Sequence, residues 1–216
     1  MGKKQKKEKR PQTEQEEKAN AFTHLLGILF TVISFPFLFF HVAGEDNILC
    51  VIGVLLFGVG MLLAYASSTS YHYVTKQKLK TRFKIFDHIS IFFLIGGSYS
   101  AVVPHYVDYD TTLIFMSVMW GIILLGSFLK LFFTGKYQWV SVILYLFLGW
   151  MLVFLVKPLS NTMPLTIFWW ILAGGLCYTV GVIFYKNQKL QYSHAIWHLF
   201  VLAGTVFHYV AIYKSY

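Results

Sequence analysis

The sequence is short of charged residues and of cysteine. Lys, Arg, Asp and Glu make up only 12% of its 216 residues, whereas 57% are hydrophobic and 19% are aromatic. A soluble domain of this length could not bury so much apolar surface, so the composition excludes an ordinary globular enzyme. The two cysteines, Cys50 and Cys177, form no CxxC pair, and we expect both to be unpaired structural thiols.

The few charged residues are concentrated at the start of the chain. Residues 1–20 hold eleven of the 27, and the others lie in short clusters between long apolar runs. We therefore expect a disordered, basic cytosolic tail over residues 1–20 and a single membrane domain over residues 21–216.

Seven apolar stretches follow the tail, and each is long enough to cross about 30 Å of hydrocarbon as a helix. They cover residues 22–42, 48–71, 85–103, 113–133, 139–156, 164–185 and 194–213. The segments between them are short and carry turn or interface residues, so none can hold a second domain. The predicted fold is an all-α integral membrane protein, a bundle of seven transmembrane helices.

Lys and Arg are divided unequally between the two sides of this bundle. When the tail and every second loop are assigned to one face, that face holds all of them except Lys157 and Lys214. The positive-inside rule then predicts a cytosolic N-terminus and an extracytoplasmic C-terminus, in a multi-pass protein of the plasma membrane. The net charge of +9 indicates attraction to anionic lipid headgroups, and nucleic-acid binding is not expected.

Five polar side chains fall at one depth beneath the predicted cytosolic face. His72 ends the second helix with Ser68 one turn deeper, and Asp87 lies in the first turn of the third helix. His194 and His198 share one face at the start of the seventh helix. Ionisable groups at this depth are costly unless they are paired or solvated. Three imidazoles with a nearby carboxylate suit Zn²⁺, so we predict a zinc site with His72, His194 and His198 as ligands.

The other histidines have a simpler interpretation. A single histidine near a helix end more often forms an interfacial hydrogen bond than a metal bond. This is the expectation for His24, His41, His88 and His105. His208 lies deeper in the seventh helix, where we expect a hydrogen bond inside the bundle, and Ser68 could equally bond the carbonyl one turn before it.

Four segments carry a family resemblance: "ANAFTHLLG", "SSTSYH", "FDHISIFFLIGGSY" and "SHAIWHLFVLAGTVFHY". They resemble the hemolysin III branch of the progestin and adipoQ receptor family, whose wider superfamily includes alkaline ceramidases. The resemblance implies a zinc held by His72, His194 and His198. It also implies that Asp87 holds and deprotonates a water at the metal, and that Ser68 supports that water or a developing oxyanion. The short tail and small loops are similar to bacterial members and lack a sizeable hormone-binding exterior.

The function expected from these features is zinc-dependent hydrolysis of a lipid amide or ester, in membrane lipid homeostasis, with Asp87 and Ser68 as catalytic residues. One alternative is a non-enzymatic regulator or sensor of membrane lipid composition or energetics, in which the zinc is structural. A cytolytic pore is a further alternative, but the helices lack a continuous polar stripe and their charges cluster at one end. Membrane lipids are the expected partners in all three cases.

Overall fold

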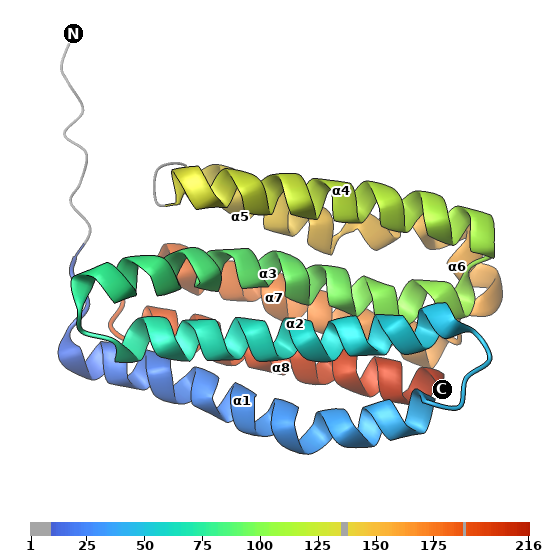
Figure 1. Cartoon of the computed structure of the whole chain (residues 1–216), viewed down its shortest axis with the longest axis horizontal. Coiled ribbons are helices and arrows are strands. Elements are labelled where there is room, and N and C mark those ends of the chain that lie inside the picture. Colours follow the sequence, from blue (N-terminus) through green and yellow to red (C-terminus); the bar gives the residue numbers. More distant parts are fainter. Residues whose placement is uncertain (1–9, 135–137, 188) are drawn as a thin grey trace, which may run out of the picture.

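The structure is a bundle of long helices that run roughly parallel to one another (Figure 1). It is a computed structural model, and it describes residues 10–134, 138–187 and 189–216. Seven spans in this part of the chain are long and apolar enough to cross a membrane, as predicted. The elements are α1 (Glu14–Val42), α2 (Ile48–Tyr73), α3 (Gln77–Tyr106), α4 (Tyr109–Phe133), α5 (Gln138–Gly149), the 3₁₀ helix η1 (Met151–Leu155), α6 (Val156–Thr162), α7 (Leu165–Lys186) and α8 (Ser193–Ser215).

The first helix begins well before the expected boundary at residue 21. The side chain of Thr13 accepts a hydrogen bond from the Glu16 amide, and the Glu16 carboxylate accepts one from the Thr13 amide. This capping box, together with three acidic residues in the first turn, starts α1 at Glu14. Residues 14–20, which were assigned to the tail, are therefore helical, while residues 1–9 lie outside the described part of the chain.

The third helix is also longer than predicted. Residues 77–84, a basic stretch expected to form a loop, are the first two turns of α3. Lysine, leucine, glutamine and arginine all favour helix, so the stretch extends the span beyond the membrane-crossing part.

The fifth span is broken into α5, η1 and α6, and it extends to Thr162 rather than to residue 156. The hydroxyl of Tyr99 is inserted at the break, where it donates to the Gly149 carbonyl at 2.8 Å and accepts from the Leu152 amide at 3.1 Å. A side chain inserted into the backbone hydrogen-bond ladder is a known cause of helix kinks. The break therefore depends on a residue of α3.

Close packing of α2 against α3 forms the centre of the bundle. A methyl group on Gly53 would collide with the Ser100 carbonyl, and one on Gly97 would collide with the backbone of α2. The two backbones approach so closely only because these positions have no side chain, as is common between membrane helices.

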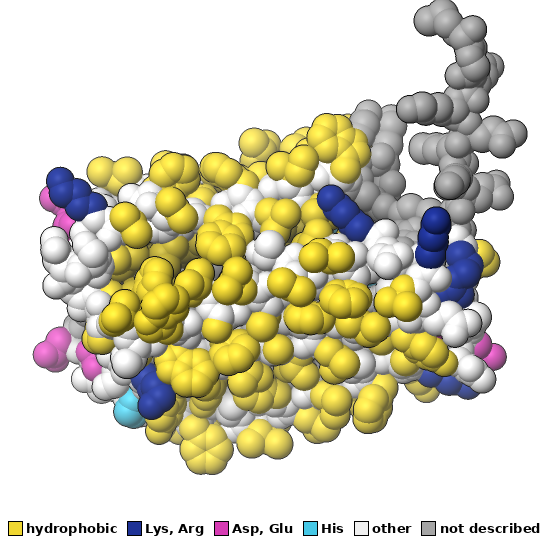
Figure 2. Space-filling view, turned by 180° about the vertical axis from the view of Figure 1, so that it is seen from behind, with side chains coloured by type: hydrophobic (Ala, Val, Ile, Leu, Met, Phe, Trp, Pro, Cys, Tyr) yellow, Lys and Arg dark blue, Asp and Glu magenta, His cyan; other side chains and the backbone are white. Residues whose placement is uncertain are grey.

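The outside of the bundle carries a broad band of hydrophobic side chains, with charged side chains toward the two ends (Figure 2). Large side chains such as Phe37, Phe40 and Phe154 are exposed on it. Exposed apolar side chains in such numbers belong in lipid, so the protein is a multi-pass membrane protein. We call the end at which α1, α3 and α8 begin the basic end, since the described Lys and Arg residues other than Lys157 and Lys214 lie there.

Candidate metal centre

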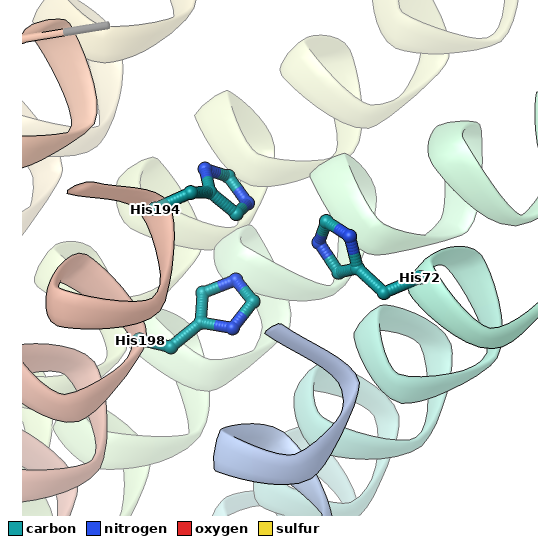
Figure 3. A group of neighbouring side chains, drawn as sticks. All are labelled: His72, His194 and His198. Atoms are coloured by element: carbon teal, nitrogen blue, oxygen red, sulfur yellow. The ribbon is translucent and has the colours of Figure 1, made fainter. Parts of the chain in front are cut away.

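Three histidines from two helices converge near the basic end of the bundle (Figure 3). His72 lies in the last turn of α2, and His194 and His198 lie one turn apart in α8. One ligand nitrogen of each lies within 4.8 Å of the others. Their ring centroids are 4.5 to 5.2 Å apart. The structure thus brings together the three residues that the sequence predicted as zinc ligands.

Hydrogen bonds from α1 orient two of these rings. His72 Nδ1 lies 2.7 Å from Glu17 Oε2, and His198 Nδ1 lies 3.1 Å from the carbonyl oxygen of Asn20. Carboxylate and carbonyl oxygens only accept hydrogen bonds, so each Nδ1 carries a hydrogen, and in the neutral ring Nε2 then has the lone pair that a metal would bind. This is the usual arrangement of a metal-binding histidine, whose second nitrogen donates to a carboxylate or carbonyl.

The Nε2 atoms provide the test of whether the residues fit a metal. In the part of the chain that the structure describes, Nε2 of His72, His194 and His198 is buried and has no hydrogen-bond partner. A buried polar atom without a partner costs about 1–3 kcal/mol, and here three of them lie together. Imidazole nitrogens in this number suit Zn²⁺, and the donor set therefore fits the predicted metal.

The first turns of α1 supply the residues that support the histidines, and the sequence interpretation missed them. Glu17 also forms an ion pair with Lys80 on α3 at 2.9 Å, and Thr23 Oγ1 lies 3.1 Å from His198 Nδ1. Glu17, Asn20 and His24 are spaced three and four residues apart, which places them on one helix face. That spacing is present in "EQEEKANAFTH", but it indicates a helix face only if residues 14–20 are helical, and the sequence prediction places them in a disordered tail.

His24 differs from the expectation of an interfacial hydrogen bond. It is 4% exposed, and its ring stacks on that of His198 with centroids 3.6 Å apart. Both of its ring nitrogens are buried without a partner among the described residues. The early start of α1 explains the difference, because it places His24 in the third turn of the helix and inside the bundle.

A second contact from α1 fixes the start of α8. Glu16 Oε1 accepts a hydrogen bond from the Tyr192 amide at 3.0 Å, and the same carboxylate pairs with Arg10 at 2.5 Å. This contact raises the pKa of the Arg10 guanidinium above its ordinary value. Tyr192 has a left-handed backbone, with φ of 57°, which is unfavourable for a residue with a side chain. Because His194 is two residues further on, Glu16 helps to set its position.

The two predicted catalytic residues are both buried. Asp87 lines the same cavity as His72 and His194, and its carboxylate lies 3.7 Å from His88 Nδ1. That nitrogen donates to the Lys84 carbonyl at 2.7 Å. The Ser68 hydroxyl is buried on α2, one turn from His72, and has no hydrogen-bond partner in the described part of the chain.

Two cavities meet beside Asp87. The smaller, of about 210 Å³, lies at the basic end and is lined by Arg10, Lys84 and two of the three histidines. The larger, of about 590 Å³, is mainly apolar and is lined mostly by α3, α5, α6, α7 and α8, with His24 of α1 also in its wall. Tyr145 and Trp197 line both, as does Asp87. The Asp87 carboxylate therefore borders both a cavity with many polar lining residues and an apolar cavity.

Similar proteins are found in bacteria and in animals. The family model described as "Haemolysin-III related" matches residues 12–209 of the chain. The chain is 36% identical to "Hemolysin-3 homolog" of Bacillus subtilis (strain 168), over 89% of this chain and 91% of the relative. It is 33% identical to "Hemolysin-3" of Bacillus cereus, over 88% and 87% respectively. It is 30% identical to "Monocyte to macrophage differentiation factor" of Homo sapiens, over 92% and 84%. No solved structure is significantly similar to the chain.

Proposed function

The chain belongs to the haemolysin-III-related family, within the progestin and adipoQ receptor family, and on this premise we propose that it is a zinc-dependent hydrolase of a lipid amide or ester. The observation that carries the proposal is the group of three buried, unpartnered Nε2 atoms, two of whose histidines line a cavity that shares Asp87 with a larger apolar cavity. A purely structural metal would require the histidines but would not require the cavity. A lipid substrate requires both.

His72, His194 and His198 would hold the zinc through Nε2, with Glu17 and the Asn20 carbonyl keeping two of the rings in place. Zinc at such a site acts as a Lewis acid and lowers the pKa of water toward about 7. Three protein ligands leave the fourth position that catalytic zinc sites need.

Asp87 is the general base of the proposed reaction. Its carboxylate takes a proton from the attacking water and returns it to the leaving amine or alcohol. It lines both cavities, so it can meet water from the polar side and a carbonyl from the apolar side. Ser68 would support the attacking water or the developing oxyanion through its unpartnered hydroxyl.

The apolar cavity would hold the hydrocarbon part of the substrate. Its volume of about 590 Å³ is within the usual range of ligand cavities, and its lining is mostly aliphatic and aromatic. The amide or ester group would then lie at Asp87, where the two cavities meet.

The proposal includes a membrane orientation and a partner. We place the basic end in the cytosol, because the Lys and Arg asymmetry follows the positive-inside rule. Arg10 and Lys84, which line the polar cavity, would then lie on the side of the anionic headgroups of the inner leaflet.

A regulator or sensor with a structural zinc is the second candidate. It is favoured by the way the histidines and their partners connect α1, α2 and α8, since a metal there would stabilise the packing of all three helices. The name "Hemolysin-3" of one relative suggests lysis for that protein, but no polar stripe along these helices supports a pore.

The substitution Asp87→Asn distinguishes a catalytic zinc from a structural zinc. The substitution nearly preserves size, so a catalytic zinc predicts normal zinc content and melting temperature with loss of lipid hydrolysis. A structural zinc predicts weaker metal binding and a lower melting temperature together. Zinc content, melting temperature and lipid turnover should be measured on one preparation, and retained turnover in Asp87→Asn would contradict the proposed mechanism.

A further inference from the structure

One face of α3 lines both cavities, and its side chains change from charged to apolar along the helix. Lys84 lines the smaller cavity, Asp87 lines both, and Leu94 and Val102 line the larger one. Residues three apart lie close together on one helix face, and α3 begins at the basic end, so Lys84 lies about one turn closer to that end than Asp87. A molecule bound along this face therefore meets a cation, then the Asp87 carboxylate, then apolar side chains.

Lys84 is a cation without an anionic partner. Its side chain is half-buried, and no carboxylate of the described residues forms an ion pair with it. Arg10, the other basic side chain of this kind in the lining, is already paired with Glu16. Lys130 of α4 is 5% exposed and lies near enough to Lys84 for the two charges to repel each other. Unpaired cations are costly away from bulk water, so the surroundings of Lys84 favour an anion.

Three hydroxyl groups supply further hydrogen-bond donors to the same cavity. They belong to Tyr71, Tyr185 and Ser193, and none of them has a hydrogen-bond partner among the described residues. Unlike Nε2 of the three clustered histidines, these hydroxyls are not fully enclosed, so a group bound in the cavity can reach them. An ammonium group together with neutral hydroxyls suits a phosphate, whose oxygens are strong acceptors.

We propose that the substrate is a glycerophospholipid, whose phosphate binds Lys84 and whose acyl ester lies at Asp87. The position of the ester rests on the proposed function. In such a lipid the ester and the phosphate are attached to neighbouring carbons of glycerol, so the short distance between them matches about one turn of α3. The acyl chain continues into the apolar cavity, and the phosphate stays toward the basic end.

This substrate narrows the proposed reaction to hydrolysis of an ester. Water adds to the ester carbonyl, and the bond to the glycerol oxygen breaks. Asp87 passes the proton of the water to that oxygen, which gives a fatty acid and a lysophospholipid.

Binding to purified protein tests the phosphate site without any need for turnover. Dioleoyl phosphatidic acid and dioleoylglycerol differ only in the phosphate, and each competes with a fluorescent diacylglycerol for the protein in a neutral detergent. Phosphatidic acid should bind about tenfold more tightly, because hydrogen bonds to charged groups account for such a factor. Equal affinity of the two lipids would overturn the inference.

A free anion is distinguished from a lipid by inorganic phosphate alone. Calorimetry should show that inorganic phosphate binds far more weakly than phosphatidic acid, because it lacks the acyl chains that fill the apolar cavity. Equal affinity would assign the site to a free anion and overturn the lipid.

Variants assign the preference for phosphate to Lys84. Lys84→Gln should remove the preference and leave the affinity for dioleoylglycerol unchanged, whereas Lys84→Arg, which keeps the charge, should retain most of it. Lys78→Gln is the matched control, because it removes the same charge from the same helix at an exposed position outside the cavity lining. A preference that survives in Lys84→Gln, or that Lys78→Gln lowers equally, would contradict the assignment. The two lipids compared on the wild type decide the matter even if Lys84→Gln does not fold.

The outcomes of the two proposals remain distinguishable. Preferential binding of phosphatidic acid without hydrolysis of any lipid amide or ester would contradict the proposed function and leave the phosphate site standing. Hydrolysis dependent on Asp87 that is equally fast for dioleoylglycerol and phosphatidic acid would contradict only this inference.

Discussion

Replacing Glu17 tests whether α1 supports the metal centre in the way the geometry indicates. The Glu17 carboxylate accepts from His72 Nδ1 at 2.7 Å and pairs with Lys80 at 2.9 Å, and its side chain is 24% exposed. Loss of such a partner of a metal-binding histidine typically weakens metal affinity ten- to a hundredfold, about 1.4 to 2.8 kcal/mol. Glu17→Gln keeps an acceptor oxygen, so we expect its zinc affinity to fall about tenfold. The zinc affinity of Glu17→Ala, which has no acceptor, should fall by nearly a hundredfold.

The assay is competition for zinc between the purified protein and a chelator of known affinity. Glu14→Gln is the matched control, because Glu14 lies on the same helix and pairs with Lys18 at 2.7 Å, but its side chain is 83% exposed. Exposed pairs of this kind contribute about 0–1 kcal/mol to stability, and this one does not touch the histidines. Identical zinc affinities for the wild type, Glu17→Ala and Glu14→Gln would refute the supporting role of α1.

Three further outcomes follow from other parts of the molecule. Glu16→Gln should weaken the contact that fixes the left-handed start of α8, and zinc affinity should fall several-fold in the same chelator assay; an unchanged affinity would mean that α8 holds His194 unaided. Tyr99→Phe should lower stability by about 2 kcal/mol, because two backbone groups within a membrane span lose their partner; an unchanged melting temperature would show that the break in the fifth span does not need the hydroxyl. A reporter fused after Tyr216 should be extracytoplasmic and one inserted between α2 and α3 cytosolic, and the reverse pattern would contradict the orientation.

The spans and the histidine cluster could be predicted because their signals are local or follow from topology. Twenty consecutive apolar residues identify a span without knowledge of its neighbours, and the spacing of His194 and His198 puts both on one helix face. His72 joins them because it ends a span that runs toward the face where α8 begins. These inferences need helix geometry and span direction alone.

The features that were missed depend on contacts between distant parts of the chain. The break in the fifth span is formed by Tyr99, about fifty residues earlier in the sequence, and no pattern within the span indicates it. The hydrogen bond between Glu17 and His72 likewise links the start of α1 to the end of α2. The early start of α1 is different, because its signal is local. "TEQE" at residues 13–16 matches a capping box and predicts a helix start within the charged segment.

The zinc content of the purified protein tests the central claim most directly. Metal analysis of the wild type should give one zinc per chain, and the double variant His194→Ala, His198→Ala should give almost none, because it leaves a single imidazole of the three. His208→Ala, on the same helix but outside the cluster, should retain the wild-type content. Full zinc occupancy in the double variant, or none in the wild type, would contradict the account.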